Sequence, residues 1–278
     1  MPMPDSPLPC MTLRFRGVRG SLPTPAPANL RYGGNTTCLE VGVAGERILV
    51  IDAGTGIRSL GLEIGASEAL SLSLLLTHFH WDHIQGIPFF TPLYSARNHL
   101  DIYSPRPVSE ALEILEGQMS APLFPVPFEY LAAVRQFHQV LEPFQVGPIR
   151  VTPFPLNHPQ GASGYRLDCA GHAIVHACDH EPGVKEVDDR IVRVAQGADV
   201  LVCDAQYTPS EFEQRRGWGH GTWLDSVKMA QRAGVGKLVL THHDPDHDDD
   251  FLDGVLACAR QEFACTFSAA EGLVLSLP

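Results

Sequence analysis

Four side chains able to bind a metal ion stand close together in the segment Thr77 to His83, which reads T-H-F-H-W-D-H. The apolar run Leu72 to Leu76 directly before it predicts a buried strand, so the string would form the turn at the strand's end. In an extended segment the first two histidines point the same way. Two imidazoles, then a carboxylate and an imidazole, suit two adjacent borderline ions such as Zn²⁺. The string therefore predicts a metal site rather than a decorated surface turn.

The same string resembles the T-H-x-H-x-D-H hallmark of the metallo-β-lactamase superfamily, and the resemblance can be followed from about Thr12 to Leu277. It implies an α+β fold, a four-layer αββα sandwich with metals at one edge between the two sheets. It also implies further ligands downstream. Residues of the right type stand at the matching places, each just past a predicted strand: His158 after VTPFPL, Asp179 after AIVHAC and His242 after KLVLT.

The resemblance assigns these residues to two divalent ions, with zinc as first choice and manganese or iron as alternatives. The first ion would be held by His78, His80 and His158, the second by Asp82, His83 and His242, and Asp179 would bridge them. His243 competes with His242 for the last place, and the direct T-H junction after the strand favours His242. Asp52, in ILVIDAGTG, is predicted either to orient a ligating imidazole or to begin a Gly-rich turn.

Two such ions would lower the pKa of a bridging water from about 16 toward about 7, so a metal-bound hydroxide would serve as nucleophile. The bond it attacks is indicated by DAQYTP at Asp204 to Pro209 and GWGHGTW at Gly217 to Trp223. Both segments resemble the phosphodiesterase branch of the superfamily, which includes ribonuclease Z and cyclic-nucleotide phosphodiesterases. In that branch an acidic residue partners a histidine near the scissile phosphate, and Asp204 and His220 match these places. Gly221 departs from the serine usual at that turn.

An alkoxide is a poor leaving group until it is protonated, and an imidazolium at His220, held charged by Asp204, could supply the proton. We therefore expect Asp82, Asp204 and His220 to be catalytic. The predicted function is a metal-dependent phosphodiesterase acting on a small phosphodiester, with cyclic nucleotides as the leading substrate class. Alternatives are a thioesterase, lactonase or β-lactamase-like hydrolase, in which Asp204 and His220 would be structural, a single-iron persulfide dioxygenase, and a non-catalytic binding protein.

Charge and composition bear on the partners. The 278 residues carry a formal net charge of −12 and no cluster of Lys and Arg, and we find no long basic arm of the kind with which ribonuclease Z grips its substrate. We therefore expect a small phosphodiester substrate, no extended nucleic acid and no membrane. The resemblance adds a possible homodimer. MPMPDSPLPC has no basic and apolar regions of a secretory signal, and seven cysteines without a C-x-x-C pair argue against a disulfide framework, so the expected location is cytoplasmic.

The elements that must position these residues form one predicted domain, residues 12–278, behind a flexible tail of residues 1–11. Strands are expected over residues 12–16, 36–43, 47–51, 72–76, 100–103, 149–154, 164–167, 173–177, 200–203, 237–240 and 273–277, and helices over 108–118, 188–195, 222–233 and 249–263. Gly17 to Thr37 either positions a phosphate or only joins two strands. Ala121 to Phe128 is too rich in proline for a helix. The acidic run Asp244 to Asp250 lacks EF-hand spacing and is predicted to cap the last helix.

Overall fold

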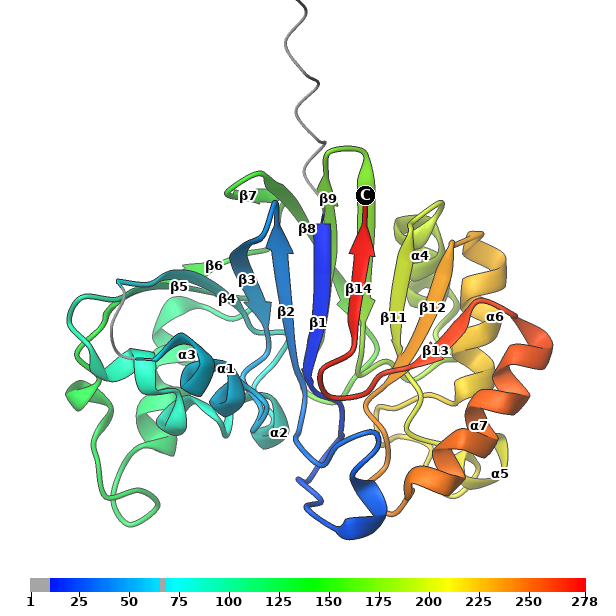
Figure 1. Cartoon of the computed structure of the whole chain (residues 1–278), viewed down its shortest axis with the longest axis horizontal. Coiled ribbons are helices and arrows are strands. Elements are labelled where there is room, and N and C mark those ends of the chain that lie inside the picture. The colour runs from blue at the N-terminus through cyan, green and yellow to red at the C-terminus, as the bar shows by residue number, and fades with distance from the viewer. Residues whose placement is uncertain (1–10, 66–68) are drawn as a thin grey trace, which may run out of the picture.

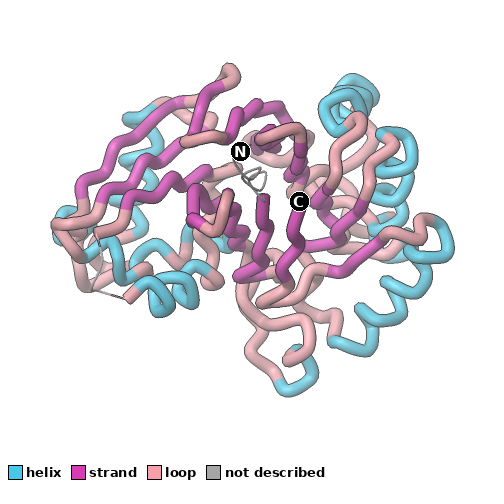
Figure 2. The backbone as a smooth tube through the Cα atoms, turned by 45° about the horizontal axis from the view of Figure 1, so that its top comes forward, coloured by secondary structure: helices cyan, strands magenta, loops and turns pink. Residues whose placement is uncertain are grey.

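The computed structural model describes residues 11–65 and 69–278, and it contains two seven-stranded sheets that face each other. Helices cover the outer face of each sheet, so the layers run helix, sheet, sheet, helix (Figure 1 and Figure 2). The predicted α+β, four-layer αββα sandwich is therefore confirmed.

The first sheet has the strand order β14-β1-β2-β3-β4-β5-β6. Its last member in the chain, β14, returns from the second half and pairs antiparallel with β1 (Figure 1). The strands are β1 (Met11–Gly17), β2 (Cys38–Val43), β3 (Glu46–Ile51), β4 (Ser71–Leu75), β5 (His99–Ser104), β6 (Val134–Gln139) and β14 (Val274–Leu277). The helices α1 (Ile57–Ile64), α2 (Trp81–Ile84) and α3 (Val108–Gln118) follow strands of this sheet.

The second sheet has the order β13-β12-β11-β10-β9-β8-β7, and β10, β11 and β12 are parallel neighbours. Its strands are β7 (Phe144–Val146), β8 (Ile149–Leu156), β9 (Ala162–Cys169), β10 (His172–Ala177), β11 (Val200–Asp204), β12 (Lys237–Thr241) and β13 (Thr266–Ser268). The helices of this half are α4 (Lys185–Ala195), α5 (Pro209–Phe212), α6 (Trp223–Ala233) and α7 (Asp249–Glu262). Thr222 caps the start of α6, and Gly234 ends it in the left-handed conformation.

The central core lies between the sheets, where alternate side chains of facing strands meet. Leu13 and Val41 from the first sheet belong to the same buried cluster as Val151 and Val202 from the second. Two further clusters fill the space between each sheet and its helices. Each sheet is thus buried on both faces, which explains why β3, β11 and β12 are nearly continuous apolar runs.

Tyr165 in β9 is fully buried and links the two sheets, since its hydroxyl donates to the carbonyl oxygen of Leu76 at 2.7 Å. Replacing it by Phe removes one buried hydrogen bond and little apolar volume. We expect the free energy of unfolding to fall by about 1–2 kcal/mol, as measured by urea denaturation. The same change at exposed Tyr130 is the control and should leave stability unaltered.

The structure departs from the predicted elements in several places. Met11, which the sequence assigned to the tail, is the first residue of β1 and pairs with Leu277; the rest of the tail, residues 1–10, lies outside the described residues. Six of the helices and strands were not predicted: α1, α2, α5, β6, β7 and β13. Strand β6, VRQFHQ, lies at a sheet edge and alternates between exposed and half-buried side chains, so it lacks an apolar run.

Other expectations agree with the structure. Residues 121–128 contain no helix apart from the first residue of a short 3₁₀ turn. Asp248 caps α7 by accepting a bond from the backbone of Phe251, so the acidic run does cap the last helix. In the described part of the chain, no helix has both the length and the apolar character that crossing a bilayer requires.

Candidate metal centre

The predicted metal ligands and Asp52 all follow the carboxyl ends of strands that point to the same edge of the sandwich. Asp52 comes after β3, His158 after β8, Asp179 after β10 and His242 after β12, while the string that begins at His78 follows β4. Asp52, Asp179 and His242 each have a positive φ, between 59° and 63°. This left-handed conformation turns the chain sharply at the strand end, and it is costly for residues other than glycine.

His78, His80 and His158 form the first cluster. His80 Nδ1 lies 3.0 Å from His158 Nε2, and the ring of His78 lies within 5 Å of both other rings, at 4.5 and 4.7 Å between centroids. One ligand atom from each residue falls within 4.8 Å of the others. Three histidines placed in this way can hold a single ion.

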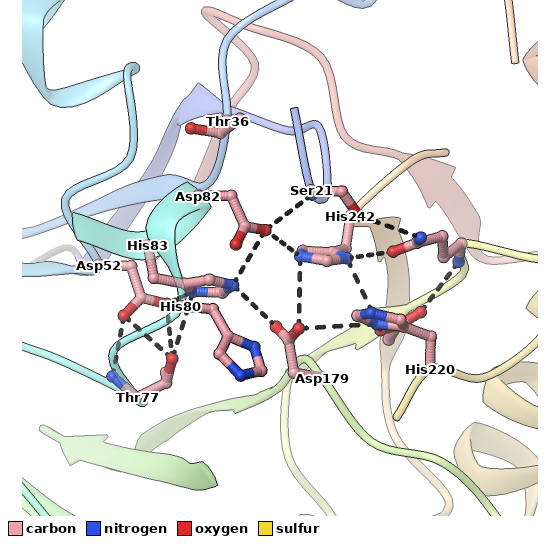
Figure 3. A network of polar contacts seen from close by, with 12 residues as sticks. Ser21, Thr36, Asp52, Thr77, His80, Asp82, His83, Asp179, His220 and His242 are labelled. Carbon is pink, nitrogen blue, oxygen red and sulfur yellow. Dashed lines mark hydrogen bonds and ion pairs between the residues drawn. The ribbon is translucent and has the colours of Figure 1, made fainter. Parts of the chain in front are cut away.

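Asp82, His83 and His242 form the second cluster, and Asp179 stands between the two (Figure 3). His242 Nε2 lies 3.2 Å from Asp82 Oδ2 and 3.4 Å from Asp179 Oδ1. The other carboxylate oxygen of Asp179 lies 3.3 Å from His83 Nε2, and its Oδ1 lies 3.9 Å from His158 Nε2. Asp179 therefore faces both clusters, as a bridging ligand must.

Each histidine uses one ring nitrogen to bind a neighbour, which leaves the other nitrogen facing the centre. These bonds orient the rings and select the tautomer. The partners are Thr77 Oγ1 for His78 (3.0 Å), Gln160 Oε1 for His80 (2.9 Å), Asp52 Oδ2 for His83 (2.8 Å), the Gly219 carbonyl for His158 (2.8 Å) and Gln206 Oε1 for His242 (2.9 Å). Asp52 thus binds the imidazole ring of His83 directly, and it also accepts a hydrogen bond from the backbone N–H of Thr77 at 2.8 Å.

Three of the atoms that face the centre have no hydrogen-bond partner among the described residues. His78 Nε2, His83 Nε2 and Asp179 Oδ2 are buried and make no hydrogen bond in the described part of the chain. Such groups cost free energy unless something satisfies them. Imidazole nitrogens and carboxylate oxygens at this spacing fit divalent cations. The fold and the clusters together indicate a binuclear site for divalent metal ions.

The electrostatics distinguish the two clusters. Burial lowers the pKa of His78 and His158, which keeps these imidazoles neutral and ready to bind a cation. Burial opposes a negative charge on Asp179, yet His242 and His83 hold the pKa of this carboxylate well below its ordinary value. Asp179, Asp82 and Asp204 in turn raise the pKa of His242 to about 9. A cation that binds at the second cluster must therefore displace protons.

His220 and Asp204 lie together beside these clusters. His220 Nδ1 is 2.8 Å from Asp204 Oδ2 and 3.6 Å from Asp179 Oδ1, and its ring stacks on His242 at 5.0 Å. Asp204 is buried, and it also accepts from the backbone of Gln206 at 2.9 Å. Because Nδ1 is engaged by a carboxylate, Nε2 is the nitrogen of His220 available for chemistry.

The structure separates His242 from its neighbour. His243 turns away from the centre, where its Nε2 donates to the carbonyl of Ala269 at 3.0 Å. No sequence motif predicts three contacts of the centre: Gln160, Gln206 and the backbone N–H of Ser21, which donates to Asp82 Oδ2 at 2.8 Å. Glutamines in loops belong to no ligand motif, and a backbone donor is invisible in a sequence.

Known proteins resemble this chain in both sequence and fold. The family model described as "Beta-lactamase superfamily domain" matches residues 47–243. Ribonuclease Z of Bradyrhizobium sp. (strain ORS 278) is 28% identical over 305 residues, which cover 93% of this chain and 97% of the relative. The metallo-beta-lactamase fold protein YhfI from Bacillus subtilis is 20% identical with a TM-score of 0.73, covering 96% and 99% of the two chains. The short form of human tRNase Z is also 20% identical, with a TM-score of 0.68 and coverage of 96% and 99%.

These relatives correct one expectation about partners. The acidic net charge and the missing basic arm predicted a small phosphodiester and excluded an extended nucleic acid, yet proteins named for their action on RNA align over nearly the whole chain. That exclusion is wrong. Net charge summed over a whole chain does not describe the few side chains around one site.

The family model covers most of the chain, and all seven predicted metal ligands lie within the matched residues. The fold, the order of the strand-end residues and the spacing of the first string agree with it. The resemblance inferred from the sequence is thereby confirmed, and this chain belongs to the metallo-β-lactamase superfamily.

Proposed function

We propose that this protein is a metal-dependent phosphodiesterase. The observation that carries the proposal is the His220–Asp204 pair, in which Nδ1 of His220 lies 2.8 Å from Asp204 Oδ2. The same nitrogen lies 3.6 Å from Oδ1 of Asp179, the carboxylate that faces both metal clusters. A hydrolase that attacks only thioesters needs no such acid, since a thiolate leaves more easily than an alkoxide. The relatives named ribonuclease Z support the same choice.

Two divalent ions bound at the clusters would supply an activated water and neutralise charge on the phosphoryl oxygens. We propose zinc, because five imidazoles and two carboxylates form a donor set that Zn²⁺ favours. The chain's own groups orient those ligands and exclude bulk water. Asp204 holds Nδ1–H of His220, so Nε2 can carry a proton to the oxygen that leaves.

We further propose that residues 12–278 act as one catalytic domain, because neither half of the sandwich holds a complete set of ligands. His78, His80, Asp82 and His83 come from the first half, and His158, Asp179 and His242 from the second. A cytoplasmic location is part of the proposal. It is supported by free thiols at all six cysteines of the described residues, four of them buried.

RNA and cyclic nucleotides are the two substrate classes to compare. The test uses protein loaded with two zinc ions per chain, and measures hydrolysis of precursor tRNA, 3′,5′-cyclic AMP and bis(p-nitrophenyl) phosphate. We expect turnover of the chromogenic diester and of at least one of the two nucleotides. Hydrolysis of a thioester or lactone panel, with no phosphodiester cleaved, would refute the proposal.

A further inference from the structure

Strained backbone gathers at the metal centre. Seven non-glycine residues of the described chain have a positive φ, and two of these, Ala44 and Ala170, lie in turns between adjacent antiparallel strands. The other five surround the centre: Ser21, Asp52, Gln160, Asp179 and His242. Strain of this kind persists where the surrounding structure enforces it, often at functional sites. The side chains of four of these five residues are predicted metal ligands or bind one. Of the five, only Ser21 has a side chain that contacts no predicted ligand.

The segment before Ser21 is held firmly against the second cluster. Gly20 donates its N–H to the carbonyl of His243 at 3.0 Å, and a Cβ at this position would stand 2.4 Å from His242 Nδ1. Arg19 is fully buried and donates to the carbonyl oxygens of Gly33 and Asp244. The loop is therefore preorganised. It presents Ser21 at a fixed place beside the ligands of the second cluster (Figure 3).

A chain of hydrogen bonds leads from a ligand to the Ser21 hydroxyl. His242 must keep Nε2 free toward the centre, so its Nδ1–H donates to Gln206 Oε1 at 2.9 Å. The amide nitrogen of Gln206 is thereby turned toward Ser21 Oγ, 3.4 Å away, and donates to it. Since Ser21 Oγ accepts this bond, its own hydrogen points elsewhere. No acceptor for that hydrogen occurs among the described residues, and the side chain is exposed.

We propose that the Ser21 hydroxyl binds substrate by donating to a non-bridging oxygen of its phosphate. The inference rests on the proposed phosphodiesterase function and names a phosphate-binding residue for it. A phosphodiester offers acceptor oxygens only, which matches a hydroxyl already oriented as a donor. Its negative charge also makes this bond stronger than one between neutral groups. The backbone strain at Ser21 keeps the hydroxyl at the rim of the centre.

Two substitutions separate the hydroxyl from the backbone. Ser21→Ala keeps the strained φ of 62°, whereas Ser21→Gly relieves it, and both remove the hydroxyl while they keep the N–H that binds Asp82. We expect both variants to lower kcat/KM for bis(p-nitrophenyl) phosphate by roughly ten- to a hundred-fold, the loss typical of one hydrogen bond to a charged group. Metal content should stay at the wild-type level. Ala44→Gly relieves the same strain far from the centre and should leave kcat/KM unchanged.

Binding of inorganic phosphate to the zinc-loaded protein gives a readout that needs no turnover. Isothermal titration calorimetry should show a phosphate affinity about ten-fold weaker in both Ser21 variants than in the wild type. If the wild type binds phosphate but cleaves no phosphodiester, the proposed function fails. The phosphate titration of the Ser21 variants then still tests whether the hydroxyl binds phosphate. The inference is overturned if Ser21→Gly retains wild-type kcat/KM and phosphate affinity, or if both variants lose metal.

Discussion

Replacing Asp179 by Ala is expected to abolish hydrolysis and to leave the protein unable to hold two divalent ions. Asp179 faces both clusters, since its Oδ1 lies 3.9 Å from His158 Nε2 in the first and 3.4 Å from His242 Nε2 in the second. Without it, neither ion has a complete set of ligands and no activated water forms. We expect kcat/KM for any phosphodiester to fall by at least about a thousand-fold. Metal content by plasma mass spectrometry and initial rates check this.

Removal of a carboxylate far from the metal ligands is the control for Asp179→Ala. Asp168 in β9 is half-buried on the same sheet and pairs with Arg166, far along the strand from the centre. Asp168→Ala should keep two ions per chain and wild-type rates. Thermal unfolding of both variants shows whether a loss of activity follows a loss of fold. An Asp179→Ala protein that is folded and still binds two ions tightly would contradict the assignment.

The second large effect concerns His220, and it should depend on the leaving group. A nucleoside alkoxide must be protonated as it departs, whereas p-nitrophenolate departs readily without a proton. We expect His220→Ala to lower kcat by about 10²–10⁴-fold on the nucleotide substrate that the wild type cleaves, and by about ten-fold or less on bis(p-nitrophenyl) phosphate. Steady-state kinetics on both substrates measure the difference.

His138 supplies the control, since it forms an equally short pair with Asp101, at 2.7 Å, on strands β5 and β6. His138→Ala removes a histidine–aspartate pair remote from the metal ligands and should change neither rate. Asp204→Asn should weaken the hydrogen bond that orients the His220 ring, and it should therefore reproduce part of the fall in kcat caused by His220→Ala. Equal losses on both substrates would show that His220 acts on binding or on the metals rather than as an acid.

Much of this architecture could be predicted from the sequence because the decisive signals are local. The string from His78 to His83 spans a single turn, and the apolar run before it marks β4. His158, Asp179 and His242 each follow a recognisable strand, so the order of strands along the chain was enough to propose that they meet. Asp52 could be suggested for the same reason, although its alternative as a turn residue was equally open.

The supporting contacts could not be predicted, because they join loops that meet only in the folded protein. Gln160 and Gln206 bind His80 and His242 through amide groups that occur in many loops without any function. Ser21 reaches Asp82 through its backbone, and any residue type has that donor. The edge strand β6 and the short β13 were missed since strand prediction depends on apolar patterns that sheet edges lack.

The return of β14 to the first sheet has a consequence for biosynthesis. Of the described strands, β14 leaves the ribosome last, yet it pairs with β1, which leaves first. While the second half is being translated, β1 has a free edge with unsatisfied backbone donors and acceptors, and such edges recruit other chains. This edge of β1 therefore stays open to misassociation until residues 274–277 have left the ribosome. A chaperone that shields β1 during that interval would raise the yield of folded protein.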